Sequence, residues 1–82
     1  MTNTLVDQIR QIAADAFAEP ISKIQLQSSP QTLQNWDSLA HLNLVLALEE
    51  SFQCELMPEE TEQMTTIAAV VAIVERKLGA ES

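Results

Sequence analysis

At residues 35–42, NWDSLAHL, a polar segment is followed by a segment with a helical pattern. Residues 28–35 are rich in Ser, Gln and Asn, whereas residues 39–52 contain no Gly, Pro or Asp and carry apolar side chains at helical spacing. Asp37 lies at the boundary, where its carboxylate can accept hydrogen bonds from the free amides of a helix start and lies favourably in the helix dipole. The pattern therefore predicts a helix over about residues 38–51, with Asp37 as its N-cap and Ser38 as its first residue.

Ser38 is placed by this prediction at a helix start, with its hydroxyl outside the bundle. The first amides of a helix have no partner within it, and together with the dipole they give a partial positive charge that favours phosphate. Ser38 is therefore a candidate for attachment of a phosphate-linked group.

The composition predicts one small all-α domain spanning residues 1–82. The chain has one Gly, three Pro and no Tyr, and it is rich in residues that favour helices. A chain of this length buries only about 60% of its unfolded surface, so it holds one thin core. The longest apolar run, residues 67–74, is far shorter than the roughly 20 residues that cross a bilayer. We expect no membrane span.

Acidic residues dominate the charge, which is −8 at neutral pH. Residues 24–75 contain no Lys or Arg, and this lack of a basic footprint argues against nucleic acid as a partner. The acids either form a solvated surface or steer the protein toward enzymes with basic patches, and both can hold together. With no secretory leader pattern and a single cysteine, Cys54, we expect a cytoplasmic monomer.

Two further main helices and one short helix are predicted around this centre. Apolar residues at helical spacing indicate a first helix over Leu5 to Phe17, with Asn3 or Thr4 as its cap. A short helix is expected to begin at Pro58, and a last main helix runs from residue 67 to 78 and is stopped by Gly79. The predicted fold is a bundle of three main helices and one short helix. A long loop, residues 19–36, joins helices one and two and contains one helical turn near residues 21–24.

The helix that begins at Ser38 is apolar on two sides. Leu44, Val45 and Leu48 share one side, and almost opposite lie three leucines that we call the leucine strip: Leu39, Leu42 and Leu46. A helix of a small bundle seldom buries both sides. The leucine strip is either covered by the preceding loop or exposed, with Glu49 and Glu50 beside it, as a docking surface for partner proteins.

Several segments in order resemble the acyl carrier protein family. They are Asp37-Ser38-Leu39, then LVLALEE at residues 44–50, PEETE at residues 58–62, and TTI at residues 65–67. A bare Asp-Ser-Leu recurs by chance, but the ordered set at these distances is more specific and covers nearly the whole chain.

The resemblance implies a carrier that is not itself an enzyme. A phosphopantetheinyl transferase would attach 4′-phosphopantetheine to Ser38, and the arm would hold an acyl group as a thioester for acyl-loading and acyl-processing enzymes of fatty-acid, polyketide or related synthesis. The interior of the bundle is a possible shelter for the acyl chain. The surface expected to meet these partners consists of Trp36, Leu39, Leu42, Leu46, Glu49 and Glu50, although Trp36 is equally plausible as a lid over the loop.

The chain also departs from carriers of fatty-acid synthesis. It has Gln34, Asn35 and Trp36 where those carriers usually have a Leu-Gly pair, and Ala40 and Asn43 where they carry acids. These differences favour a carrier of a dedicated pathway.

Two alternatives use the same residues. An aminoacyl or peptidyl carrier would modify the same serine, and an unmodified interaction module would use only the leucine strip. A Ser-His hydrolase built on Ser38 and His41 is disfavoured, because there is no nucleophile-elbow pattern and no second base. His41 is expected to be half covered and to bond a loop carbonyl. No metal site is expected, since the carboxylates lack calcium-loop spacing.

Overall fold

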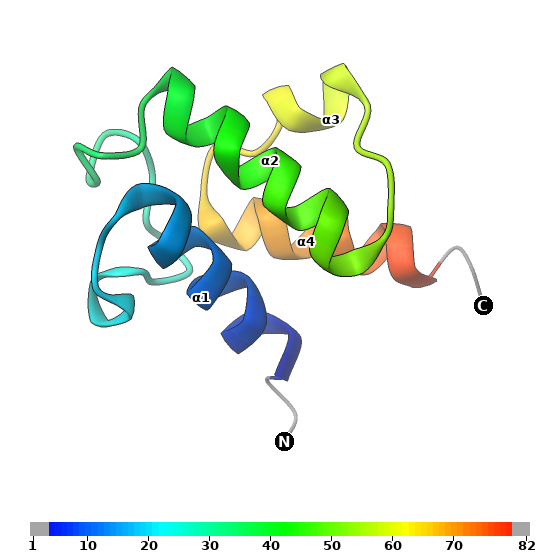
Figure 1. Cartoon of the computed structure of the whole chain (residues 1–82), viewed down its shortest axis with the longest axis horizontal. Coiled ribbons are helices and arrows are strands. Elements are labelled where there is room, and N and C mark those ends of the chain that lie inside the picture. Colours follow the sequence, from blue (N-terminus) through cyan, green and yellow to red (C-terminus); the bar gives the residue numbers. More distant parts are fainter. Residues whose placement is uncertain (1–3, 80–82) are drawn as a thin grey trace.

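The computed structural model describes residues 4–79, and within that range every regular element is helical (Figure 1). This confirms the predicted all-α fold of three main helices and one short one. The elements are α1 (Thr4–Phe17), a 3-10 turn η1 (Ile21–Lys23), α2 (Ser38–Phe52), α3 (Pro58–Glu62) and α4 (Ile67–Gly79). None of the helices in this part of the chain has the length and apolar character that a membrane crossing requires.

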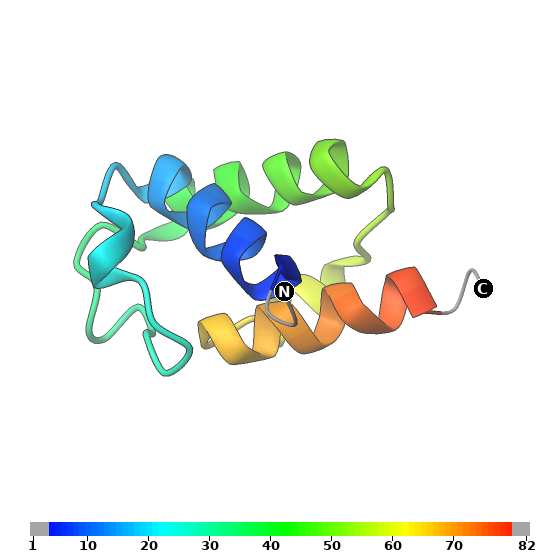
Figure 2. The same ribbon diagram turned by 90° about the horizontal axis from the view of Figure 1, so that it is seen from below.

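Helices α2 and α4 lie on opposite sides of the molecule, and α1 packs against both (Figures 1 and 2). The short α3 lies at the edge beside α2 and α4. The long loop between α1 and α2 fills one end of the bundle, so that the start of α2 meets both this loop and α3.

Helix α2 begins as the sequence predicts. Asp37 has an extended backbone, and its carboxylate accepts a hydrogen bond from the Ala40 amide at 2.9 Å. The helix ends at Gln53, which adopts a left-handed conformation (φ 53°) and donates its amide to the Glu49 carbonyl. Its buried side carries Ala40, Leu44, Val45 and Leu48.

Helices α1 and α4 complete the core. Ile9, Ala13 and Phe17 of α1 are buried, and the predicted cap Asn3 lies outside the described residues. The start of α4 is capped by the Thr66 hydroxyl, which accepts a hydrogen bond from the Ala69 amide at 3.1 Å. Gly79, which we expected to stop this helix, is its last residue.

The long loop is fixed to the bundle. Its apolar residues Ile24 and Leu33 are buried in the core, whereas Ile21 and Leu26 are exposed. The carbonyls of Leu26 and Ser28 accept hydrogen bonds from the first two amides of α4, at 2.8 and 3.1 Å. These bonds satisfy amides that have no partner within the helix, so the loop acts as a backbone cap for α4.

Candidate functional site

Ser38 is the first residue of α2 and is exposed. The Asp37 carboxylate binds the Ala40 amide, and the Asp37 carbonyl accepts from the His41 amide at 2.8 Å. The amides of Ser38 and Leu39 precede the first intrahelical bond, so they and the helix dipole give the start of α2, where Ser38 lies, a partial positive charge. A phosphodiester on this hydroxyl fits the electrostatics of the helix start.

A surface pocket of about 470 Å³ opens beside Ser38. It lies between the loop, the first turn of α2, α3 and the link from α3 to α4. Its lining residues are Pro30, Trp36, Asp37, Ser38, His41, Thr61, Glu62, Met64 and Thr65. The lining from Pro30 and from residues 61–65 was not predicted, because these residues follow no periodic pattern and meet only in the folded chain.

A hydrogen-bond chain crosses the inner wall of this pocket. The indole Nε1–H of Trp36 donates to Nδ1 of His41 at 3.0 Å, and Nε2 of His41 lies 2.9 Å from the carbonyl oxygen of Thr61. Because Nδ1 accepts, the ring hydrogen is assigned to Nε2, which donates to Thr61. His41 therefore bonds a carbonyl of α3, where we expected one of the loop, and connects the three segments around Ser38.

Trp36 lies in the core and not on the docking surface where we expected it. Its side chain is 3% exposed and stacks on Phe17, with ring centroids 5.0 Å apart and an interplanar angle of 26°. The large apolar ring and its satisfied N–H explain this burial. Trp36 is therefore not exposed for a partner to contact, and it lies beneath the junction of loop and helix instead of covering it.

The leucine strip is exposed and is not covered by the loop. Leu39, Leu42 and Leu46 are 68%, 53% and 54% exposed. At about 100° per residue, Ser38 lies at the edge of this strip, about 40° around the helix from Leu42 and about 100° from Leu39. Of the two positions where carriers of fatty-acid synthesis have acids, Ala40 is buried and Asn43 is exposed.

The two glutamates beside the leucine strip differ in environment. Glu50 is exposed, but Glu49 is half-buried and its carboxylate accepts the Leu56 amide at 2.9 Å. Glu49 therefore also holds the link that follows α2.

Helix α3 is held in place by Glu60. This carboxylate accepts the Met57 amide at 2.8 Å and pairs with the Lys77 ammonium of α4 at 2.9 Å. The Lys77 hydrogen bond, assisted by that of Met57, holds the pKa of Glu60 below its usual value. The carboxylate thus fixes the outer wall of the pocket.

Ser38 and His41 are not arranged as a catalytic pair. Both ring nitrogens of His41 are engaged with Trp36 and Thr61, so His41 is not oriented as a base for Ser38. Over residues 4–79, no cluster of three His, Cys, Asp or Glu residues is arranged to hold a metal ion. Ser38 offers an exposed hydroxyl on a capped helix start, beside an apolar strip.

No protein-family model matches the chain. It is similar to Acyl carrier protein 3 of Ralstonia nicotianae, with 32% identity over 75 residues that cover 92% of this chain and 86% of the relative. It also matches the solution structure of holo acyl carrier protein from Geobacter metallireducens, with a TM-score of 0.82 over 93% of this chain and 87% of that one. The sequence identity there is 22%, so this second likeness bears on the fold alone. By its relative and its fold, this chain belongs to the acyl carrier protein family.

Proposed function

We propose that the protein carries an acyl group on a 4′-phosphopantetheine arm attached to Ser38. The observation that carries the proposal is the exposed Ser38 hydroxyl at the first residue of α2, with Asp37 as its cap. In the attachment, the Ser38 oxygen displaces the nucleotide part of coenzyme A, forms a phosphodiester, and loses its proton. The terminal thiol of the arm supplies the thioester chemistry.

The carrier's own residues supply placement and recognition. The exposed amides and dipole of the α2 start favour the phosphodiester, and the leucine strip gives partners an apolar surface next to it. We infer that the transferase and the acyl-loading and acyl-processing enzymes dock there, with Glu50 meeting basic residues of the partner. Tethering raises the effective concentration of the acyl group at each enzyme.

We further propose a carrier of a dedicated pathway that works in the cytoplasm as a monomer. Asn43 on the exposed side of α2 leaves the surface near Ser38 less acidic than in the carriers of fatty-acid synthesis. Enzymes that recognise acids at this position would therefore bind it weakly.

Intact-protein mass spectrometry tests the attachment. The wild-type protein and Ser38→Ala are incubated with coenzyme A and a broad-specificity phosphopantetheinyl transferase. We expect one phosphopantetheine on the wild type and none on the variant. A wild-type protein that several transferases leave unmodified would overturn the proposal and favour an unmodified interaction module.

A docking variant separates recognition from chemistry. Leu42→Ser changes an exposed residue of the leucine strip and leaves Ser38 and its cap in place. We expect slower modification by the transferase, with an unchanged melting temperature. Asn43→Ser, at the neighbouring exposed position, is the matched control and should be modified at the wild-type rate.

A further inference from the structure

We propose that Trp36 closes the interior of the bundle to the acyl group, so that this carrier takes short acyl groups and not long alkyl chains. The inference rests on the proposed attachment at Ser38. It concerns the path from Ser38 to the core that runs through the pocket beside Ser38, and Trp36 lies at the inner side of that pocket.

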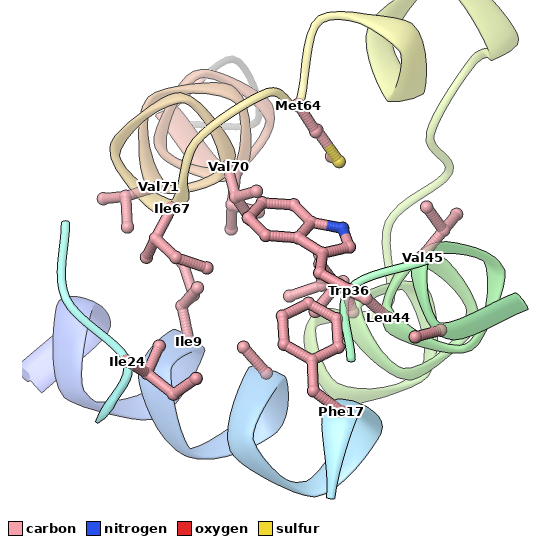
Figure 3. Packing of buried hydrophobic residues seen from close by; sticks show 14 of the residues in the cluster. Ile9, Phe17, Ile24, Trp36, Leu44, Val45, Met64, Ile67, Val70 and Val71 are labelled. Atoms are coloured by element: carbon pink, nitrogen blue, oxygen red, sulfur yellow. The ribbon is translucent and has the colours of Figure 1, made fainter. Parts of the chain in front are cut away.

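The pocket beside Ser38 ends at the indole ring. Trp36 and Ser38 line the same pocket, and the Trp36 side chain is buried at its inner side. Figure 3 shows the ring between the side chains of Phe17 and Met64, with Val70 next to it. A chain that entered the bundle from Ser38 through this pocket would have to displace the ring.

The ring is held on two sides. Its face stacks on Phe17, and its N–H is fixed by Nδ1 of His41, which is itself fixed by the Thr61 carbonyl. Moving the ring aside would break the stack and remove a hydrogen bond from a buried donor. The closure is therefore a fixed part of the fold and not a loose side chain.

The interior behind the ring is filled. Its largest side chains are less than 2% exposed, and they include Leu44, Ile67 and Val70. Close-packed cores accept extra methylene groups poorly. A long alkyl chain, which gains stability from each methylene that it buries, finds no place there.

The pocket itself suits a short group. It is open to solvent, and the Thr61, Glu62 and Thr65 side of its lining is polar. A short acyl group can lie in the open part of this pocket with its polar end toward these residues. A long alkyl chain would leave most of its surface in water.

Loading with acyl groups of different length tests the closure. A broad-specificity transferase moves acetyl-, butyryl- or octanoyl-phosphopantetheine from the corresponding coenzyme A thioester to Ser38. We measure the melting temperature and the NMR signal of the Trp36 indole N–H for each form. In the wild type we expect the same melting temperature for all three forms and an unmoved indole signal.

Two variants locate the barrier. Trp36→Leu removes the closure, so we expect a lower melting temperature that the octanoyl form, but not the acetyl form, raises by several degrees. Phe52→Leu is the matched control, because Phe52 packs against the core at the far end of α2. The octanoyl group should leave its melting temperature unchanged.

The outcomes separate the two proposals. If no arm is attached to Ser38, the proposed function fails and this inference falls with it. If the arm is attached and the octanoyl group raises the wild-type melting temperature or shifts the indole signal, only the inference is overturned. An octanoyl group that fails to stabilise a folded Trp36→Leu protein would also overturn it. If Trp36→Leu does not fold, the wild-type series decides alone.

Discussion

At the scale of single residues, Asp37 determines where α2 begins. Its carboxylate accepts the Ala40 amide, and Ser38, the next residue, is exposed. The same hydrogen bond therefore contributes to stability and positions the candidate attachment point.

We expect Asp37→Ala to lower the stability by about 1 kcal/mol, the usual loss for an N-cap. For a domain of this size the melting temperature should fall by about 4–8 °C, as measured by circular dichroism. Asp37→Asn keeps an oxygen acceptor and should stay close to the wild type. If Asp37→Ala and Asp37→Asn both melt equally far below the wild type, the charge of Asp37 stabilises the helix and its capping hydrogen bond does not.

The sequence predicts individual residues well where a local rule applies. Asp37 and Ser38 were found because a cap and a helix start are properties of neighbouring residues. Trp36 was misplaced because its burial depends on Phe17 and on His41, which bonds across to α3. Long-range contacts of this kind leave no periodic trace in the sequence.

At the scale of elements, the helix ends carry unfavourable backbone conformations. Gln53 after α2 and Ala18 after α1 both have a positive φ, of 53° and 57°. This left-handed region suits glycine, and a side chain there is strained.

We expect Gln53→Gly to raise the stability by about 0.5–1 kcal/mol, since the relief of strain exceeds the added freedom of the unfolded chain. Chemical denaturation measures the change. Gln53→Ala keeps the Cβ and the strain, so it should bring no gain. An equal gain in both variants would show that the Gln53 side chain, and not the backbone, was unfavourable.

The Glu60–Lys77 pair makes the attachment of α3 depend on pH. The pKa of Glu60 is lowered in the folded state, chiefly by its hydrogen bond with Lys77, so the stabilisation is present above the usual glutamate pKa. It is lost as the pH falls through the lowered pKa. Glu60→Gln should melt a few degrees below the wild type at neutral pH. This difference in melting temperature should disappear in acid.

Melting temperatures measured from neutral pH into the acid range check this. Glu59→Gln removes the same charge from the exposed neighbour in the first turn of α3 and serves as the control. If the melting temperature of Glu60→Gln stays equally far below that of the wild type through the acid range, the ion pair does not have this role.

The elements themselves were largely predictable. Apolar periodicity gave all three main helices, and Pro58 and the acids after it gave α3. The sequence did not predict that the long loop is fixed to α4. The hydrogen bonds between α4 and the carbonyls of Leu26 and Ser28 join segments about 40 residues apart.

At the scale of the whole molecule, negative charge exceeds what ion pairs neutralise. The net charge is −8, and the described residues form three ion pairs, two of them within single segments. Exposed pairs contribute little, so repulsion among the remaining acids dominates.

Added salt should therefore raise the melting temperature of the unmodified protein, because it screens this repulsion more than it weakens the pairs. Scanning calorimetry between about 0.05 and 0.5 M NaCl measures the slope. A variant with Glu50, Glu55 and Glu59 changed to Gln should show a smaller slope. A flat or falling curve for the wild type would mean that the acids are too widely spaced to repel.

The exposed leucine strip has a consequence for how copies of the protein behave toward each other. An apolar surface of this kind invites self-association, and on this molecule a like charge on every copy opposes it. Mutual repulsion between copies therefore keeps the leucine strip accessible. As the solution is acidified toward the isoelectric point, this repulsion weakens, and the leucine strip becomes the surface through which the protein aggregates.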